Sequence, residues 1–343
     1  MTGTHEEPEL KLCQGFWHRH DIREQDPAIV AVDQAICTSF RLADKWGFFD
    51  RSGKLMPEAT DYFGPNNTYM FQVPELSCEV ADVPDHGKSG LIFGGRVNLH
   101  FGHFLLETLP RLWSIARAGL GGRKVLYQSG FALSDWYNRP FVKPCFEALR
   151  IRESDIVQCT GPEIVRDVLV PLPCVQQNSW IHRDAARSLF NKIGTELLAG
   201  NDASINEVPV YLSKTRYKQK GTGIINEIDL EENLARLGVE IIYPETLSLV
   251  DQIRIFKHRK TIIGALGSAF HTAAFAQPAG RQIILAHNYH VNSNYRLFDI
   301  AGGNDPEYYY SKNIIELGKT PEISYTLRCD NPQVVARALY DLI

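Results

Sequence analysis

A regular alternation of apolar strands with amphipathic helices between residues 208 and 286 is the feature that most constrains the fold. Strands separated by helices at this spacing form βαβ units, in which the strands run parallel and the helices cover the sheet. We therefore expect a Rossmann-like α/β domain in this half of the chain. The predicted strands are 208–213, 239–243, 260–263 and 282–286, and the predicted helices are 226–237, 247–258 and 268–276.

One of these strands, 260–263, runs into a glycine-rich turn that opens the next predicted helix. Gly264 and Gly267 lie in the turn, and Ser268 stands where the helix would begin. Free backbone N–H groups and the positive end of the helix dipole suit a phosphate, and glycine lets the backbone approach it closely. We expect Gly267 and Ser268 to bind a phosphate, with His271 one helical turn further on. An ordinary strand-to-helix turn is the alternative interpretation.

The N-terminal half has a buried strand of its own, 91–95, followed by a predicted helix over about 98–118. Apolar residues recur in this helix at steps of three and four, which gives it one buried face. A strand leading into a helix again favours an α/β domain. We therefore divide the chain into domains 1–175 and 176–343, and expect a final helix at 332–343 that could pack back on the first domain.

The composition excludes several classes of protein. Hydrophobic residues make up 44% of the 343 residues, charged residues make up 22%, and the net charge is −4. This balance does not favour a nucleic-acid partner. Apolar runs stay below the roughly 18 residues of a membrane span, and the polar, acidic first residues are unlike a signal peptide. The seven cysteines contain no CxxC pair, so we expect reduced thiols, no zinc site and a cytoplasmic protein.

The N-terminal helix carries the candidate catalytic residues. His100, His103 and Glu107 are spaced i, i+3 and i+7 and therefore share one face of a helix. A carboxylate that orients an imidazole and balances its charge makes a general base. We take His103, oriented by Glu107, as the base, with Glu107 itself as the second choice. A metal site is disfavoured because the His-Glu-x-x-His order of zinc helices is absent. In a purely structural alternative, the histidines cap the helix and Glu107 is solvated or pairs with Arg111.

A run of cations follows the strand at 208–213. Lys214, Arg216, Lys218 and Lys220 fall within seven residues. The forked guanidinium of an arginine can grip a diphosphate, and lysines add point charge. Because this run and the glycine turn both leave strand ends of the same predicted sheet, they could meet at one diphosphate. Most charge runs are solvated loops, and that interpretation stays open here.

Glu245 lies just before the predicted helix 247–258. It could bond a ribose hydroxyl or a base edge, or it could simply favour the positive end of the helix dipole. The motifs Asp-x-Asp, GxxxxGK[ST], GxGxxG and GxSxG do not occur in the sequence. These absences disfavour a P-loop NTPase, a dinucleotide dehydrogenase, a serine hydrolase and a transferase that holds a divalent ion with Asp-x-Asp.

Two regions, roughly 90–115 and 208–290, resemble glycosyltransferase family 61. In the first, Asn98, His103 and an acidic residue precede Leu-Pro-Arg on a helix, as in the N-terminal signature of the family. Two positions depart from the common pattern, since Glu107 stands where Asp is usual and Leu266 precedes Gly267 where a His or Glu is usual. The second region matches in order and spacing through Tyr211-Leu-Ser213-x-x-Arg216, Asn226-Glu227, Tyr243-Pro244-Glu245 and Gly264-x-x-Gly267-Ser268-Ala269-x-His271.

The resemblance implies a GT-B fold, in which two Rossmann-like domains face a central cleft. It implies a nucleotide-sugar donor bound by domain 176–343, a glycan or lipid-linked oligosaccharide acceptor bound by domain 1–175, and inverting transfer without a metal or other cofactor. Asn98, His100 and Arg111 are then expected on the acceptor side. The chain resembles the bacterial type, which is associated with capsule or other surface polysaccharide.

Three alternatives remain open at this point. A Mg²⁺-dependent sugar-phosphate or phosphoryl transferase could use the same cations. A non-catalytic protein could bind a nucleotide sugar without turning it over. A structural subunit of a polysaccharide assembly complex would bind no nucleotide. Peripheral membrane association and a homo-oligomeric state are also left open.

Overall fold

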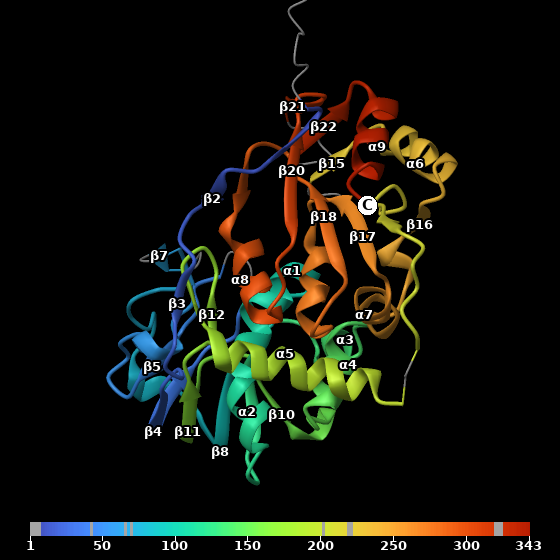
Figure 1. Ribbon diagram of the computed structural model, residues 1–343. Helices are drawn as coiled ribbons and strands as arrows, with labels where there is room; N and C mark the ends of the chain where they lie inside the picture. The colour runs from blue at the N-terminus through green and yellow to red at the C-terminus, as the bar shows by residue number, and fades with distance from the viewer. Residues whose placement is uncertain are drawn as a thin grey trace, which may run out of the picture. The chain divides into compact units, whose positions relative to one another are not determined.

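The computed structural model describes residues 8–41, 44–64, 67–68, 71–200, 203–217, 222–318 and 325–343. Its contacts divide the chain into two compact units. We call residues His18–Ala199 the N-terminal unit, and Met1–Trp17 together with Gly200–Ile343 the C-terminal unit. Both units combine helices with sheets, so the expected α/β class is confirmed (Figure 1).

The main sheet of the N-terminal unit has the strand order β10-β9-β8-β11-β4-β5. Strands β10, β9, β8 and β11 pair in parallel, whereas β4 pairs antiparallel with β11 and β5. The predicted strand 91–95 is the end of β8, whose buried residues Leu91 and Phe93 join the core of this sheet. The strand bounds are β4 (Ile29–Cys37), β5 (Phe48–Asp50), β8 (Asp85–Arg96), β9 (Lys124–Gln128), β10 (Ile156–Cys159) and β11 (Glu163–Pro171).

The helix that follows β8 is not uniform. It begins as α1 (Phe101–His103), widens into the π-helical segment η3 (Phe104–Thr108), tightens into the 3₁₀ segment η4 (Leu109–Leu112) and ends as α2 (Trp113–Ala118). The sequence predicts one continuous helix over about 98–118. Pro110 explains part of the difference, because proline has no N–H group to continue the α-helical hydrogen-bond ladder. Single π turns of this kind are frequent at functional sites.

The remaining described helices of the N-terminal unit are α3 (Leu133–Tyr137), α4 (Val142–Ala148) and α5 (Arg183–Leu198). Helix α5 packs against α2 and α4, and buries Leu189, Phe190 and Ile193. The chain therefore divides after Ala199, whereas the sequence suggests a boundary at 175. The unit also has two small sheets. One consists of β3 (Asp21–Arg23), β13 (Trp180–His182) and β12 (Val175–Gln176), and the other pairs β6 (Tyr62–Phe63) with β7 (Asn67–Thr68).

The main sheet of the C-terminal unit has the order β1-β20-β18-β17-β14-β16. All of these strands pair in parallel except β1, which lies antiparallel to β20 at the edge. The βαβ alternation predicted for residues 208–286 is therefore confirmed. The bounds are β1 (Leu10–Leu12), β14 (Val210–Leu212), β16 (Glu240–Ile242), β17 (Thr261–Ala265), β18 (Arg281–Leu285) and β20 (Glu307–Ser311).

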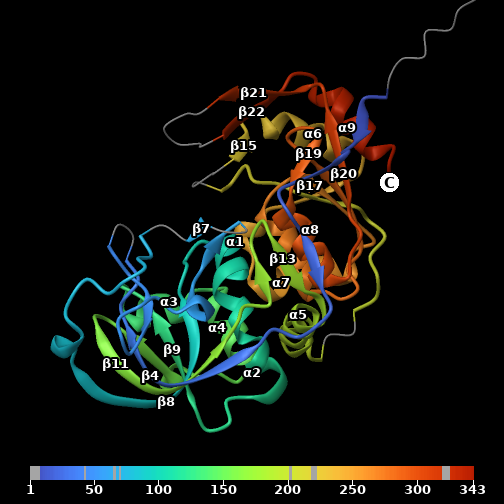
Figure 2. The same ribbon diagram turned by 90° about the vertical axis from the view of Figure 1, so that its left-hand side faces the viewer.

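The core of the C-terminal unit lies between this sheet and two helices, α6 (Glu227–Arg236) and α9 (Pro332–Tyr340). These helices lie side by side in both views (Figures 1 and 2). The final helix of the chain therefore packs on α6 within the C-terminal unit. The other helical segments are η6 (Pro244–Thr246), α7 (Leu249–His258), η7 (Ser268–Phe275) and α8 (Ser293–Gly302).

Short strands flank the C-terminal sheet. They are β2 (Gly15–Trp17) with β19 (His290–Asn292), and β21 (Ile314–Gly318) with β22 (Tyr325–Cys329) and β15 (Thr222–Ile224) (Figure 2). Among the described residues of both units, no helix is both long enough and apolar enough to cross a membrane.

Candidate active site

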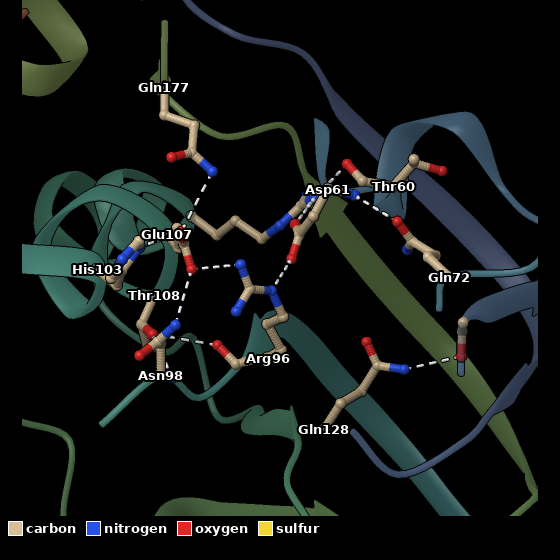
Figure 3. Close-up of polar contacts among 12 residues, drawn as sticks. Thr60, Asp61, Gln72, Arg96, Asn98, His103, Glu107, Thr108, Gln128 and Gln177 are labelled. Atoms are coloured by element: carbon tan, nitrogen blue, oxygen red, sulfur yellow. Dashed lines mark hydrogen bonds and ion pairs between the residues drawn. The ribbon is translucent and has the colours of Figure 1, made fainter. Parts of the chain in front are cut away.

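His103 and Glu107 form a pair across one helical turn. His103 ends α1 and Glu107 lies in the π-helical segment η3, and the distance from His103 Nδ1 to Glu107 Oε1 is 2.6 Å (Figure 3). The side chain of His103 is 44% exposed, whereas that of Glu107 is 5% exposed. The imidazole can therefore meet a substrate while the carboxylate supports it from behind. The pairing predicted from the sequence is present.

Further donors converge on the same carboxylate. Arg96, the last residue of β8, donates from Nη2 to Glu107 Oε2, which also accepts from Asn98 Nδ2 at 3.1 Å. Gln177 Nε2 donates to Glu107 Oε1 at 3.2 Å (Figure 3). A carboxylate held by hydrogen bonds and a cation of this kind is stabilised in its ionised form. Glu107 therefore pairs with Arg96, and not with Arg111 at i+4.

The Arg96 guanidinium links Glu107 to a second carboxylate. Its Nε donates to Asp61 Oδ2 at 2.8 Å, and its side chain is fully buried. Asp61 in turn accepts from Arg111 Nη2 at 3.4 Å. The array Asp61–Arg96–Glu107–His103 thus places the buried Arg96 between two carboxylates, with the more exposed His103 at one end.

Burial and charge act against each other on the Glu107 pKa. Burial alone would raise it, but the charge of Arg96 and the hydrogen bond and charge of His103 outweigh burial, so the net pKa is below its usual value. The hydrogen bond to Glu107 raises the pKa of His103, opposed by burial and by Arg96. Because an ionised carboxylate has no proton to donate, Nδ1 of His103 carries the hydrogen and Nε2 is left to accept a proton.

A cavity of about 30 Å³ lies beside the array. Asp61, Arg96, Glu107 and Gln177 are among its lining residues. A space of this size holds about one water molecule. Because the side chain of His103 is far more exposed than that of Glu107, His103 is the more accessible of the two to an acceptor.

Three residues are expected on the acceptor side, and each has a different environment in the structure. Asn98 holds Glu107, as described above, and its Oδ1 accepts from the backbone N–H of His100 at 3.0 Å. The rings of His100 and His103 are 5.2 Å apart, and burial, aided by His103, lowers the pKa of His100. Arg111 is buried and donates to the backbone carbonyls of Glu58, Thr60 and Pro171.

In the C-terminal unit, the predicted cationic loop leaves the carboxyl end of β14. The Arg216 side chain is exposed, and its guanidinium carbon lies 3.7 Å from the centre of the Tyr243 ring, just after β16. Glu245 is also exposed, in η6. Lys218 and Lys220 lie outside the described residues. The structure thus places Arg216 and the segment around Glu245 at neighbouring strand ends.

Lys214, which belongs to the cationic loop predicted from the sequence, contacts the glycine turn after β17. Lys214 Nζ donates to the carbonyl of Leu266 at 2.5 Å. A Cβ atom on Gly267 would overlap the end of the Lys214 side chain, so glycine makes room for this cation. His287, just after β18, is also nearby, and burial, aided by Lys214, lowers its pKa to about 3. The ends of β14, β17 and β18 therefore bring a cation, a glycine turn and a neutral imidazole together.

Ser268 begins the segment after the turn, but that segment is a 3₁₀ helix rather than the predicted α-helix. His271 lies within it and is only 5% exposed. Its ring stacks on Phe298 at 4.1 Å and lies 4.7 Å from Tyr295. The structure therefore places Gly267 and Ser268 at the turn, and His271 behind it against α8.

Sequence patterns did not identify Arg96, Asp61 and Gln177. Arg96 follows the Gly94-Gly95 pair and is the last residue of β8, so its place at a strand end was a usable signal. Asp61 and Gln177 come from segments far from the helix in the chain, and nothing local marks them. Among the described residues, no group of three or more His, Cys, Asp or Glu side chains converges to hold a metal ion.

A family model described as Glycosyltransferase 61 matches residues 101–284, which is more than half of the chain. The match includes His103, Glu107, Arg216 and Gly267, whereas Asp61 and Arg96 precede it. No curated protein matches the chain.

Proposed function

The chain belongs to glycosyltransferase family 61 and is a glycosyltransferase, and from that premise we propose that it transfers a sugar from a nucleotide-sugar donor to a glycan hydroxyl. We further propose inversion at the anomeric carbon and no requirement for a metal ion. The observation that carries the proposal is the array of His103, Glu107 and Arg96. It presents a partly exposed imidazole, backed by an ionised carboxylate, with one nitrogen left to accept a proton.

Inverting transfer is a single in-line displacement. The acceptor oxygen bonds to the anomeric carbon as the bond from that carbon to the diphosphate breaks. The hydroxyl proton passes to Nε2 of His103, and the Nδ1–H of the resulting imidazolium stays bonded to Glu107. A positioned base of this kind typically contributes about 10²–10⁴-fold to the rate. The leaving nucleoside diphosphate takes the bonding electrons and must be met by positive groups.

Those positive groups come from the C-terminal unit in this proposal. Lys214 and Arg216 supply charge, and Gly267 and Ser268 supply backbone and hydroxyl donors at the turn. Glu245, exposed and following Tyr243, is assigned to the ribose or the base. His271 shapes the segment behind the turn. Lys218 and Lys220 stay predictions.

The proposal includes a GT-B arrangement, in which two Rossmann-like units face a central cleft and complete one substrate site. Its support is that each unit has its own sheet of mostly parallel strands. Cytoplasmic synthesis of a surface polysaccharide, with a glycan or lipid-linked oligosaccharide as acceptor, is proposed on the resemblance to bacterial members.

A thermal stabilisation experiment tests the proposal first. The protein is heated with a panel of nucleoside diphosphates and nucleotide sugars, each with and without EDTA. Ligands that bind only the folded protein raise its melting temperature by mass action. We expect a rise with the diphosphates and sugars of one base, unchanged by EDTA. Donor hydrolysis or transfer is then measured with the nucleotide sugar that stabilises most.

Each other outcome favours a different function. Turnover that EDTA abolishes and Mg²⁺ restores would indicate a metal-dependent sugar-phosphate or phosphoryl transferase. Stabilisation by nucleotide sugars without turnover in the presence of glycan acceptors would indicate a non-catalytic binding protein. No stabilisation by any nucleotide would contradict the proposed donor and favour a structural subunit.

A further inference from the structure

Glu231, on α6, is a buried carboxylate that the proposed mechanism does not use. It is 3% exposed. Its Oε1 accepts hydrogen bonds from the hydroxyls of Ser213 and Thr215, the latter at 2.6 Å, and its Oε2 accepts from the Tyr243 hydroxyl at 3.1 Å. Burying an ionised carboxylate is costly unless hydrogen bonds or charges compensate. The convergence of hydroxyl donors on Glu231 supplies that compensation.

These bonds connect the ends of two neighbouring strands. Ser213 and Thr215 follow β14, Tyr243 follows β16, and the two strands pair in parallel. One turn earlier on α6, Glu227 accepts from the Tyr211 hydroxyl at 3.0 Å and from the backbone N–H of Lys214 at 3.3 Å. Helix α6 therefore holds the start of the cationic loop through carboxylates at i and i+4.

Tyr243 links the buried Glu231 to the exposed Arg216. Its ring lies 3.7 Å below the guanidinium carbon of Arg216, within the range of a cation–π contact. A phenol that donates to a carboxylate becomes more electron-rich, which strengthens the attraction of its ring face for a cation. Long arginine side chains lose considerable rotamer entropy when they are fixed. A ring that already holds Arg216 reduces the entropy lost when an anion binds it.

We infer that Glu231 is a positioning residue for diphosphate binding, which fixes the Tyr243 ring and through it the Arg216 guanidinium. The ligand class is the diphosphate of a nucleotide or nucleotide sugar. This inference rests on the proposed role of Arg216 as a donor-binding residue. It adds that the affinity of the loop depends on a buried carboxylate that never touches the donor.

The test measures binding of the nucleoside diphosphate that stabilises the wild type most, and of inorganic pyrophosphate, by calorimetry. Arg216→Ala should weaken binding about 10–100-fold, because hydrogen bonds to charged groups are lost. Tyr243→Leu removes the ring and should weaken binding about 3–30-fold. Tyr243→Phe keeps the ring and loses the bond to Glu231, so a smaller loss, about 2–5-fold, is expected. Glu231→Gln should fall between the two tyrosine variants.

Two measurements distinguish positioning from a general loss of structure. In the Arg216→Ala background, Glu231→Gln should weaken binding no further, because Glu231 acts through Arg216. By ¹⁵N relaxation of the Arg216 Nε–Hε group, the side chain should be ordered in the wild type and mobile in Tyr243→Leu and Glu231→Gln. This second measurement needs no ligand.

Matched controls exist in the same unit. Tyr340 lies under Arg337 on α9 at 5.8 Å, so Tyr340→Leu removes a similar aromatic–arginine pair elsewhere. Glu232, exposed and paired with Arg236, is the neighbour of Glu231 on α6, so Glu232→Gln removes a carboxylate from the same helix. Both controls should bind diphosphate as the wild type does.

The outcomes separate this inference from the proposed function. If Arg216→Ala binds diphosphate normally, or if the wild type binds none, the proposed role of Arg216 is wrong, and the relaxation measurement still decides whether Glu231 orders its side chain. If Arg216→Ala binds weakly while Tyr243→Leu and Glu231→Gln bind normally, the inference alone is wrong. An additive loss in the double variant would likewise contradict it.

Discussion

In the N-terminal unit, the charged residues around the candidate base are buried and paired with one another, whereas in the C-terminal unit the cations stand at strand ends and Arg216 is exposed. Arg96 and Glu107 are almost fully removed from solvent and satisfy each other. Arg216 rests on an aromatic ring, and Lys214 rests on a backbone carbonyl. The first arrangement pairs its charges in the protein interior, and the second leaves the Arg216 guanidinium exposed to solvent.

The difference follows from the two tasks proposed for these residues. A base must have a defined proton affinity before its substrate arrives, and fixed, desolvated charges provide that. A residue that binds a diphosphate must exchange its resting contacts for phosphate oxygens. A weak resting contact, such as the Tyr243 ring face under Arg216, orients the cation without neutralising it.

Replacing Glu107 should have the largest effect, because it breaks the buried pair. Glu107→Ala leaves the buried Arg96 with Asp61 as its remaining carboxylate partner, which typically costs about 1.5–3 kcal/mol of unfolding free energy, and it should lower transfer about as much as loss of His103 does. The folded-state pKa of Glu107 is lowered, so its contribution to stability is present above about pH 4.5 and fades as the pH falls through the folded value. Chemical denaturation at pH 7 and pH 4 measures the loss of stability and its pH dependence, and a sugar-transfer assay measures the loss of activity.

Glu163 gives a matched control for Glu107. It is also a buried carboxylate in the N-terminal unit, and it pairs with Lys88 at 2.6 Å. Glu163→Ala should lower stability but leave the specific activity of the folded protein unchanged. If both variants lost activity in proportion to stability, Glu107 would have only a structural role.

His103→Ala should remove activity without removing stability. A loss of about 10²–10⁴-fold in kcat is expected for a general base, while the melting temperature changes little because the side chain is partly exposed. The raised pKa of His103 places the acid limb of the wild-type pH–rate profile above 6.5, and this limb should be missing from the variant. His86→Ala, at an exposed histidine of the same unit, is the control. A full-rate His103→Ala enzyme would disprove the assignment.

Replacing Lys214 or Gly267 should have a smaller effect, and the effect should appear in donor binding. Lys214→Met keeps the aliphatic stem and loses the charge, so the donor KM should rise about 10–100-fold with a smaller change in kcat. Gly267→Ala should resemble it, because the added Cβ would displace the Lys214 side chain. Gly161→Ala, where a Cβ would meet nothing within 4 Å, is the control. Normal KM values in both test variants would show that the turn does not meet the donor.

Replacing Asp299 should have the smallest effect, a change in stability with pH. The replacement tests how a buried carboxylate with a raised pKa differs from Glu107, whose pKa is lowered. Asp299 is buried like Glu107, but burial raises its pKa well above normal, and the hydroxyl of Tyr308 donates to it. Because the folded pKa is raised, wild-type stability should fall as pH rises from about 4 towards that value. Asp299→Asn removes this dependence, so it should be more stable than the wild type at pH 8 and not at pH 4. Thermal unfolding at both pH values measures the difference.

Local patterns predicted what depends on local geometry. The alternation of apolar strands with amphipathic helices predicted the parallel C-terminal sheet, since the spacing of hydrophobic residues distinguishes its strands from its helices. The His103–Glu107 pair was predictable because residues four apart on a helix are neighbours. The overall α/β class followed from the same reasoning.

Contacts between distant segments were not predictable in this way. Arg96 pairs with Asp61 and Glu107 because a strand end, a loop and a π-helical turn meet, and only the folded chain shows this. Lys214 was recognised as a cation, but its place on the Leu266 carbonyl depends on neighbouring strand ends. The π and 3₁₀ segments replaced predicted α-helix for the same reason, since packing overrides propensity.

The antiparallel pairing of β1 with β20 has a consequence for how the chain is assembled during synthesis. Leu10 pairs with Ser311, so the edge of the C-terminal sheet joins residues about 300 apart in the chain. Residues 18–199 are continuous and can fold while the ribosome is still adding the rest, because domains generally fold as units. The C-terminal sheet gains its last strand only when β20 has emerged. Until then the segment that becomes β1 has no partner strand, and the unpaired edge of β18 is open to pairing with another copy.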